Sequence, residues 1–459
     1  MSAAPAPGLI VAAPSTGSGK TLITMGIIAA LTRAGRRIAA FKTGPDYIDP
    51  AFHSAALGVE GGCLNLPCIN LDGWAMDDAQ LAGLLAAPAG ELIVGEGVMG
   101  LFDGARGVTG HDQQGRGDGS TADLAARLGL PVILVVDAKG QGASLAALVE
   151  GFARHRADTP IAAVILNRVS GDSHAALLKD ALAPLGLPVL GALPAAPDLA
   201  LPSRHLGLVQ ARETANLAAL IARAADWIAR HVDLAALVAL AQPPKLAAPA
   251  AAPLVPPLVP PLVPPLGTRI AVARDDAFAF AYPALLDGWR RAGADLSFFS
   301  PLADQAPEPR ADAVYLPGGY PELHAGKLAA NRRFHAGLAA AAQAGGVVYG
   351  ECGGYMVMGE ELVDAEGRAH PMAGLLRIST SFAARKLHLG YRQARGLDGG
   401  GPLGAAEYRG HEFHYATVLR EEGEPLFAIR DAAGHDLGRC GLRAGRVMGS
   451  FLHLIAQSR

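Results

Sequence analysis

The sequence is poor in cysteine and in charged residues. It holds four cysteines among 459 residues, Cys63, Cys68, Cys352 and Cys440, which are too few and too scattered for the disulfide framework of a secreted domain. Cys63 and Cys68 have no second pair that would complete a zinc site, so we expect them to be unpaired. Charged residues form 18% of the chain and hydrophobic residues 51%, which excludes disorder of the whole chain. These shortages predict a folded, cytoplasmic protein.

The chain also lacks an excess of positive charge and long apolar runs. Its 39 lysines and arginines face 42 acidic residues, a formal net charge of -3, so bulk electrostatics provide no attraction to nucleic acid or to an anionic membrane. No stretch of about 20 residues runs without a polar residue or a proline, as a membrane helix would. The start of the chain has no basic segment typical of a signal peptide. We expect no membrane or nucleic-acid partner.

Proline is concentrated in one segment, residues 253–265, which repeat Pro-Leu-Val-Pro three times. Repeated prolines remove backbone donors and fix φ, so we expect an extended spacer between two cores. We therefore predict a first domain at 1–242, a linker at 243–266 and a second domain at 267–459. A proline-rich ligand for a partner protein is the alternative, which the lack of basic residues beside the repeats disfavours.

Apolar runs alternate with amphipathic stretches in both predicted domains. Continuous apolar strands that are each followed by a helix indicate a parallel sheet covered on both faces. The predicted strands lie at 9–12, 38–42, 92–96, 132–136, 161–166 and 189–192 in the first domain and at 270–273, 313–316 and 347–350 in the second. The predicted fold class is α/β, with two α/β domains.

A glycine-rich segment, Ala-Pro-Ser-Thr-Gly-Ser-Gly-Lys-Thr at 13–21, connects the first predicted strand to a helical stretch, as a P-loop requires. Gly17 and Gly19 would let backbone N–H groups face phosphates. Lys20 would reach the β and γ oxygens, and Thr21 would ligate Mg²⁺. The strict pattern has one more glycine at its start, which this chain lacks, and a helix-capping loop is the alternative. We predict binding of ATP with Mg²⁺.

The segment after the second predicted strand is rich in side chains that bind ligands. Asp46, Tyr47 and Asp49 follow that strand, and ligands of open α/β sheets lie beyond the carboxyl ends of the strands. We predict substrate contact for Asp46 and Tyr47 and metal contact for Asp46. The alternative is a turn that caps a helix, because Asp-x-x-Asp-Pro is ordinary turn chemistry.

Polar residues also follow two further strands. Glu96 ends an apolar strand, where an acid in a P-loop protein is placed to hold Mg²⁺. Asp103 lies in the glycine-rich segment that follows and would contact substrate, unless it only forms a turn. Asn167 closes another strand and would bind an adenine edge, with an asparagine turn as the alternative.

A second group of motifs predicts nucleophilic catalysis in the second domain. Cys352 lies on a glycine-rich turn between a strand and a helix, which exposes a nucleophile at the edge of a sheet. We expect the helix N-terminus to lower the pKa of this thiol. His453 would be its base, and the backbone N–H groups of Gly318 and Gly319 would form an oxyanion hole.

Taken together, these motifs resemble the family of cobyrinic acid a,c-diamide synthases, which includes the hydrogenobyrinic acid enzymes. The resemblance spans nearly the whole chain and implies an N-terminal domain similar to dethiobiotin synthetase and a C-terminal class I glutamine amidotransferase domain. The segments that carry it lie at 17–21, 44–50, 96–104, 201–207, 318–322, 351–355 and 410–415.

The resemblance implies a ligase that uses ATP, Mg²⁺ and L-glutamine. ATP would phosphorylate a corrinoid carboxylate, and Cys352, with His453 as its base, would release ammonia from glutamine. Asp46, Tyr47 and Asp103 would lie near the corrinoid carboxylates. The family is also expected to be homodimeric.

One departure concerns the base of the amidotransferase. Amidotransferases with a full catalytic triad carry glutamate two residues after the histidine, whereas this chain has Ile455, and the synthases that it resembles are described as lacking that acid too. The residue that orients His453 is therefore unknown from the sequence.

Two alternatives remain open. A P-loop switch protein would use nucleotide to drive dimerisation, but such switches carry an extra lysine where this chain has Ser15. The substrate could also be a nickel tetrapyrrole rather than a corrinoid, and the sequence does not say whether a corrinoid substrate contains cobalt.

Overall fold

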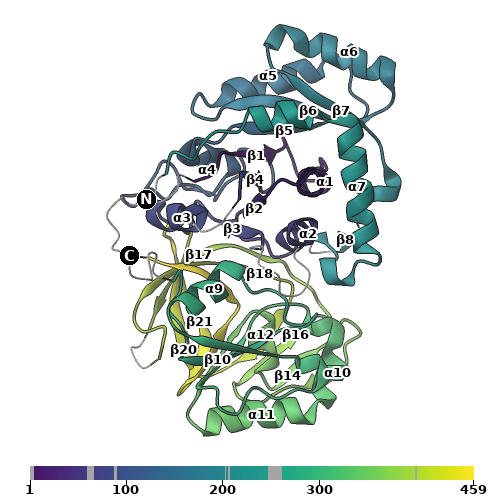
Figure 1. The fold of residues 1–459 in the computed structure, drawn as a ribbon. Coiled ribbons are helices and arrows are strands. Elements are labelled where there is room, and N and C mark those ends of the chain that lie inside the picture. The colour runs from purple at the N-terminus through teal and green to yellow at the C-terminus, as the bar shows by residue number, and fades with distance from the viewer. Residues whose placement is uncertain are drawn as a thin grey trace. The chain divides into compact units, whose positions relative to one another are not determined.

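The structure is a computed structural model that describes residues 5–58, 67–86, 90–201, 203–204, 207–246, 261–397 and 401–458 (Figure 1). The chain divides into two compact units. The first comprises Met1–Gly104 and Thr109–Ala252, and the second Ala105–Val108 and Pro253–Arg459. The predicted bounds of the linker and of the two domains remain a prediction. Cys63 lies outside the described residues, whereas Cys68 is buried and free, as expected.

The first unit is built on a seven-stranded sheet of order β3-β2-β4-β1-β5-β6-β7. Its described pairings are all parallel, which confirms the predicted parallel sheet. The sequence did not predict β3, which has only three residues. The strands are β1 (Gly8–Ala12), β2 (Ile38–Thr43), β3 (Ile69–Leu71), β4 (Leu92–Glu96), β5 (Val132–Asp137), β6 (Ile161–Val169) and β7 (Val189–Pro194).

Helices cover both faces of this sheet, with α1 and α7 on one side and α3 and α4 on the other in Figure 1. Gly26 lets α1 approach α7 closely, because a Cβ there would lie 2.6 Å from Ile228 Cγ1 and 3.0 Å from the Ala224 carbonyl oxygen. The helices are α1 (Lys20–Arg33), α2 (Asp49–Ala56), α3 (Asp78–Ala86), α4 (Thr121–Leu128), α5 (Leu145–His155), α6 (Asp172–Leu182), α7 (Leu217–His231) and α8 (Leu234–Ala239).

The second unit contains a ten-stranded mixed sheet of order β11-β10-β12-β13-β22-β21-β20-β17-β18-β23. Along this order, the first five strands, β11 to β22, pair in parallel. From β22 onward to β23 at the other edge, each strand pairs antiparallel with the next. The strands are β10 (Arg269–Ala273), β11 (Asp295–Phe299), β12 (Ala313–Leu316), β13 (Val347–Glu351), β17 (His388–Gly396), β18 (Glu407–His414), β20 (Glu424–Asp431), β21 (Asp436–Ala444), β22 (Val447–Ser450) and β23 (Leu452–Gln457).

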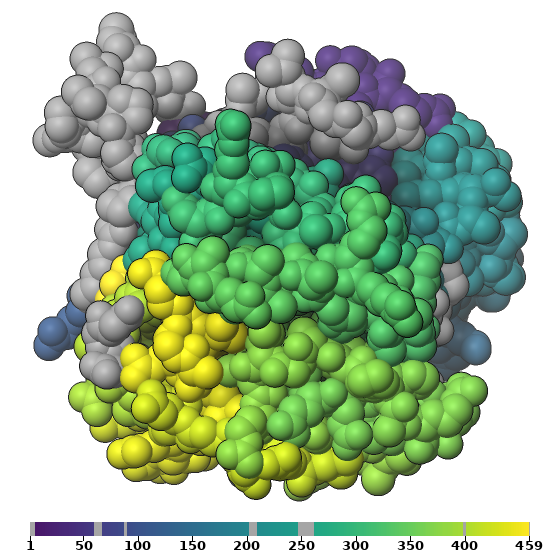
Figure 2. Space-filling model, turned by 90° about the horizontal axis from the view of Figure 1, so that it is seen from below, coloured from purple at the N-terminus to yellow at the C-terminus, as the bar shows by residue number. Residues whose placement is uncertain are grey.

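A smaller four-stranded sheet of order β15-β14-β16-β19 completes this unit. In the space-filling view of Figure 2, the green and yellow segments of the unit form one continuous surface. These strands are β14 (Glu361–Val363), β15 (Ala369–Pro371), β16 (Ile378–Ser381) and β19 (Thr417–Glu421), and the helices are α9 (Pro283–Arg291), α10 (Ala325–Ala330), α11 (Arg332–Gln343) and α12 (Gly353–Val357). The α/β class predicted for both halves of the chain is confirmed.

The two ends of the proline-rich segment pack against the units. Lys245 N donates to the Leu128 carbonyl at 2.7 Å in the first unit. In the second, Trp289 Nε1 donates to the Val263 carbonyl at 3.0 Å, and the Leu262 side chain is buried. Both ends of the predicted linker therefore pack against a unit, with burial of apolar side chains between the prolines, and the extended conformation of 253–265 stays a prediction. Residues 247–260 of the predicted linker lie outside the described residues.

In the described part of the chain, no helix combines the length and the hydropathy that crossing a membrane requires.

Candidate active sites

The first candidate site is the glycine-rich loop between β1 and α1. Gly17 and Gly19 have φ of 81° and 94°, a conformation that glycine adopts without strain. The Lys20 ammonium donates to the Met99 carbonyl at 2.6 Å and to the Ser15 carbonyl at 3.2 Å. Burial lowers the pKa of Lys20 to about 8. Phosphate oxygens would compete with two neutral carbonyls for this cation, and an anion offers the stronger hydrogen bond.

Two residues near the end of β6 hold this loop in place. Asn167 Nδ2 donates to the Ser18 carbonyl at 2.9 Å, and Asn167 Oδ1 accepts from Arg168 N at 2.9 Å. The Arg168 guanidinium donates to the Gly17 carbonyl at 2.9 Å. A Cβ at Gly19 would lie 2.4 Å from Asn167 Nδ2, so this position requires glycine. The structure thus gives Asn167 a role in the loop itself, and its contact with adenine stays a prediction.

Beside the loop lies a buried cluster of charged side chains at the carboxyl ends of β2 and β4. The Lys42 ammonium bonds Asp49 Oδ2 at 2.6 Å and Glu96 Oε1 at 3.0 Å. The Thr21 hydroxyl donates to Glu96 Oε1 at 2.9 Å. His53 Nε2 contacts Glu96 Oε2. The cluster therefore connects the first residues of α1 with the ends of two neighbouring strands.

The charges of this buried cluster shift the pKa values of its members. Burial opposes ionisation of Glu96, but Lys42 and His53 outweigh it and hold the pKa of this carboxyl below its usual range. Burial also opposes the charge of Lys42, yet Asp49 and Glu96 raise the pKa of this ammonium. For Asp49, burial and the nearby Asp46 raise the pKa. Glu96 and Lys42 are therefore a permanent ion pair near neutral pH.

The donor set of this cluster fits a magnesium ion. Thr21 contributes a hydroxyl oxygen, and Glu96 and Asp49 contribute carboxylate oxygens that lie within 3.3 Å of it. Magnesium prefers such hard oxygen ligands together with water and substrate phosphates. Asp49, rather than Asp46, is the second carboxylate in contact with Thr21.

The predicted substrate residues lie on loops next to this cluster. Asp46 Oδ1 accepts from the backbone N–H groups of Ile48 and Asp49 at 2.8 and 3.1 Å, at the start of α2. Asp103 Oδ2 accepts from Gly100 N at 2.8 Å, and Asp103 is exposed. Both carboxylates thus make the turn contacts that were the alternatives to function. The substrate roles of Asp46, Tyr47 and Asp103 and the metal role of Asp46 stay predictions.

The turn that contains Asp103 lies against the phosphate loop. Leu101 N donates to the Ala13 carbonyl at 2.8 Å. A Cβ at Gly100 would lie 2.6 Å from the Pro14 carbonyl oxygen. The segment after β4 is therefore held beside the loop, so a substrate bound by Asp103 would lie near the nucleotide.

No role was predicted for Lys42 or His53 from the sequence. Both are buried and both contact Glu96. A lysine at the end of an otherwise apolar strand, four residues before one acid and seven before another, was the available signal. Buried lysines require a paired charge, so this pattern could have indicated the ion pair.

The second candidate site surrounds Cys352, between β13 and α12. Cys352 has φ of 48° and ψ of -106°, a strained conformation for a residue with a side chain. Cys352 N donates to the Ser450 carbonyl at 2.8 Å. A Cβ at Gly354 would lie 1.9 Å from the Leu316 carbonyl oxygen, so the tight turn requires glycine there. These contacts fix the predicted nucleophile turn.

His453, on β23, lies beside Cys352. A Cβ at Gly318 would lie 2.4 Å from His453 Cε1, 3.2 Å from His453 Nε2 and 3.3 Å from Cys352 Cβ. One glycine therefore borders both predicted catalytic side chains. Gly319 N lies 3.0 Å from the position of a Cβ at Gly353, so the glycine pair borders the nucleophile turn. The catalytic and oxyanion-hole roles of these residues stay predictions.

Both predicted catalytic groups are buried and neutral. Burial raises the pKa of the Cys352 thiol above its ordinary value and lowers the pKa of His453 well below its ordinary value. The prediction of a lowered thiol pKa is therefore wrong for this state, because the five residues of α12 do not offset the loss of hydration. The resting pair is a thiol and a neutral imidazole, which suits general-base activation.

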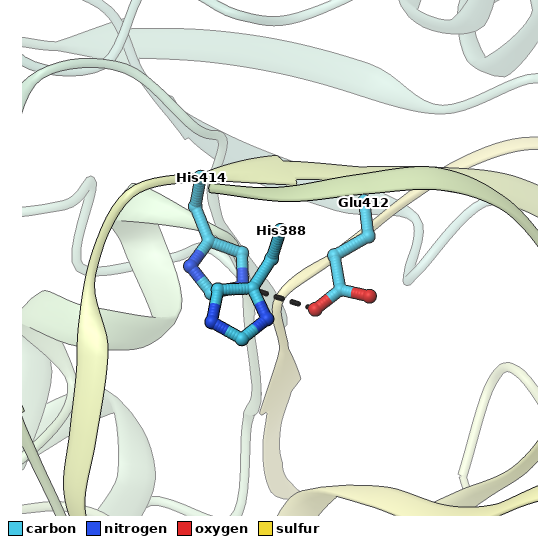
Figure 3. A group of neighbouring side chains, drawn as sticks. All are labelled: His388, Glu412 and His414. Atoms are coloured by element: carbon cyan, nitrogen blue, oxygen red, sulfur yellow. Dashed lines mark hydrogen bonds and ion pairs between the residues drawn. The ribbon is translucent and has the colours of Figure 1, made fainter. Parts of the chain in front are cut away.

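Near this site, His388, Glu412 and His414 point toward one another from β17 and β18 (Figure 3). Their ligand atoms lie within 4.8 Å of one another. The two rings stack at 4.6 Å, and His414 Nε2 lies 3.0 Å from Glu412 Oε1. The Arg392 guanidinium already bonds Glu412 Oε2 at 2.7 Å. The one carboxylate of this group is therefore already bonded by Arg392 and His414.

Comparison with known proteins agrees with this division into two sites. Residues 9–209 match the model of the CobQ/CobB/MinD/ParA nucleotide binding domain, and residues 269–459 match the model of the CobB/CobQ-like glutamine amidotransferase domain.

Relatives are similar along the whole chain. A hydrogenobyrinate a,c-diamide synthase of Brucella anthropi is 52% identical, with 98% of each chain covered. The hydrogenobyrinate a,c-diamide synthase of Rhodobacter capsulatus is 53% identical, with 98% of each chain covered. That of Rhizobium meliloti is also 53% identical, with 98% of this chain and 99% of the relative covered. Similarity at this level over both domains shows common ancestry of the entire chain, and the protein belongs to the hydrogenobyrinate a,c-diamide synthase family.

Proposed function

We propose that this chain converts hydrogenobyrinate into its a,c-diamide, using ATP to activate each carboxylate and glutamine as the source of nitrogen. The observation that carries the proposal is that one chain holds a phosphate-binding loop next to a buried acid cluster and, in its other unit, a thiol beside an imidazole. A carboxylate is a poor acyl donor, so amidation requires activation and a nitrogen nucleophile. The two sites would provide these separately.

Activation of the carboxylate belongs to the first unit. A carboxylate oxygen would attack the γ-phosphorus of ATP, and the bond to ADP would break, which gives an acyl phosphate. The Lys20 ammonium would bind the transferred phosphoryl oxygens. Thr21, Glu96 and Asp49 would hold Mg²⁺, which when bound neutralises phosphate charge. Asp46, Tyr47 and Asp103 would bind the corrinoid carboxylates.

Release of ammonia belongs to the second unit. Cys352 Sγ would attack the side-chain amide carbon of glutamine while His453 Nε2 takes the thiol proton. The N–H groups of Gly318 and Gly319 would stabilise the negative oxygen. His453 would return the proton to the departing ammonia, and water would hydrolyse the thioester to glutamate. Ammonia would then displace phosphate from the acyl phosphate.

The relatives' names favour a cobalt-free corrinoid, because they specify hydrogenobyrinate. A nickel tetrapyrrole has no such support. A nucleotide switch with an inert second domain would not need the strained turn at Cys352 or the glycine that borders it and His453. We further propose that the enzyme is cytoplasmic and homodimeric.

The test is a direct assay of the product. The purified chain, with Mg²⁺, ATP and glutamine, should convert hydrogenobyrinate into a product with the mass of the diamide, and cobyrinate should react more slowly. Equal rates on both corrinoids would remove the preference for the cobalt-free substrate. No amide from either corrinoid, with normal release of ammonia from glutamine, would contradict the proposed substrate class.

A further inference from the structure

The position that carries the third member of a catalytic triad is apolar in this chain. In a full triad this position, two residues after the histidine, carries a glutamate; here it lies on β23, where the pairing with β18 is irregular. Ile455 is instead buried, with 2% of its surface exposed. The carboxyl group that supports His453 must therefore come from another element, if the site has one.

A buried acid from another strand of the same sheet lies beside His453. Glu351 is the last residue of β13, directly before Cys352, and only 2% of it is exposed. Its Oε2 lies 3.9 Å from His453 Nδ1. This separation is too long for a hydrogen bond, and catalytic hydrogen bonds that are long in an unliganded enzyme tighten when substrate binds.

Three donors hold this carboxyl group in place. The Tyr315 hydroxyl donates to Glu351 Oε2 at 2.8 Å, and the Tyr349 hydroxyl donates to Oε1 at 3.1 Å. Leu454 N, next to His453 in the chain, donates to Oε1 at 3.1 Å. An acid is costly to bury unless its oxygens are bonded. Here the bonds also tie Glu351 to the backbone beside the histidine.

The orientation of the imidazole agrees with this placement. The edge formed by His453 Cε1 and Nε2 borders Gly318, which also borders Cys352, whereas Nδ1 is the atom within 3.9 Å of Glu351. His411 stacks on the ring with 4.8 Å between centroids. The ring thus has one nitrogen toward the thiol side and the other toward the acid.

We propose that Glu351 replaces the missing triad acid as the positioning residue of His453. It holds the ring so that Nε2 faces the thiol, and its carboxylate stabilises the imidazolium formed when the thiol proton moves to Nε2. The inference rests on the proposed release of ammonia from glutamine. It differs from the pattern of amidotransferases with a full triad because the acid precedes the nucleophile instead of following the base.

The charge state of Glu351 adds a pH readout. The titratable groups that face this carboxyl are Tyr315 from β12, Tyr349 from β13 and His453 from β23. Burial raises the pKa of both tyrosines, and burial raises the pKa of Glu351 to about 7. Only the ionised acid stabilises an imidazolium. The rate of ammonia release should therefore increase with pH through about 7.

The experiment compares Glu351→Gln with the wild type in two assays on the full chain. Release of ammonia from glutamine should fall by about 10²-fold or more in kcat, because a neutral amide does not stabilise an imidazolium. The KM for glutamine should stay within about three-fold, and amidation from ammonium within about two-fold, since neither uses the acid. The increase with pH through about 7 should disappear.

A matched control removes an acid–histidine pair elsewhere in the same unit. Asp364 Oδ2 bonds His370 Nε2 at 2.8 Å, near β14 and β15. Asp364→Asn should leave both assays unchanged. Glutamine-dependent activity of Glu351→Gln within about three-fold of the wild type would overturn the inference. A wild type that releases no ammonia from glutamine would instead overturn the proposed function.

A second variant decides the case in which Glu351→Gln does not fold, shown by loss of both activities. Glu351→Asp keeps the charge but shortens the side chain by one carbon. A loss confined to the glutamine-dependent activity supports the positioning role. Equal loss in both assays, or no loss in either, overturns it, because Glu351 would then serve only the fold.

Discussion

At the residue scale, the structure explains which side chains the sequence could identify. Lys20, Cys352 and His453 lie in local patterns with their own chemistry, so each could be predicted from its neighbours in the chain. Glu351 could not, and neither could the contact of Lys42 with Glu96, because these partners are far apart in sequence and close only in the fold. The sequence indicated that the usual acid was absent after His453, but a carboxyl group from another strand is visible only once the sheet is assembled.

Lys20 gives a prediction about pH. Its pKa of about 8 results mainly from burial, so in the free enzyme the ammonium loses its proton as pH rises above about 8. A neutral amine attracts phosphate less than an ammonium does. The KM for ATP should therefore increase between about pH 7 and 9.5, in steady-state assays with ammonium as the nitrogen source.

Lys20→Arg is the control for this prediction. A guanidinium stays charged throughout that range, so the variant should show no increase in KM with pH, whatever its affinity for ATP at neutral pH. A wild-type KM that does not change with pH would mean that this amine is not the phosphate ligand.

The lack of a side chain at Gly318 gives a prediction about the position of the His453 ring. A Cβ there would lie 2.4 Å from His453 Cε1, so Gly318→Ala must displace the imidazole. We expect the rate of ammonia release from glutamine to fall by about 10²-fold, the usual effect of misplacing a catalytic group by about 1 Å. Amidation from ammonium should not change.

The matched control for Gly318→Ala lies in α10 of the same unit. At Gly326 a Cβ would have His370 Cε1 at 3.5 Å as its nearest neighbour, an ordinary contact, so Gly326→Ala should keep both activities. If Gly318→Ala releases ammonia at the wild-type rate, the glycine does not border the reacting pair as described.

At the scale of elements, the apolar runs in the sequence predicted the parallel strands better than the antiparallel strands. The six strands predicted in the first domain and the three in the second are all present. Such strands are apolar without interruption because helices cover both faces. β3 has three residues, too few for a pattern. The antiparallel strands β17 to β21 are partly exposed, so their alternating residues give a weaker signal.

The contact between α1 and α7 gives a prediction about stability. A Cβ at Gly26 would lie 2.6 Å from Ile228 Cγ1, so Gly26→Ala overpacks the helix interface. We expect the free energy of unfolding to fall by about 1–3 kcal/mol, measured by urea denaturation. Gly151→Ala in α5, where a Cβ meets nothing within 4 Å, should instead raise it by about 0.5–1 kcal/mol. Similar effects at both positions would contradict the close packing of α1 on α7.

At the scale of the whole molecule, the two proposed reactions are divided between the two units. The phosphate loop, the acid cluster and the segment with Asp103 belong to the first unit. Cys352, His453 and Glu351 belong to the second. Ammonia is the only species that the second reaction must supply to the first. Loss of the thiol should therefore stop the use of glutamine without stopping amidation itself.

The most direct measurement of this central claim follows the nitrogen atom. Hydrogenobyrinate is incubated with ATP, Mg²⁺, glutamine labelled with ¹⁵N in its side-chain amide, and unlabelled ammonium, and the diamide is analysed by mass spectrometry. The wild type should place ¹⁵N in both new amides, whereas Cys352→Ala should form the same diamide without label. An unlabelled wild-type product, or label in the product of Cys352→Ala, would contradict the account.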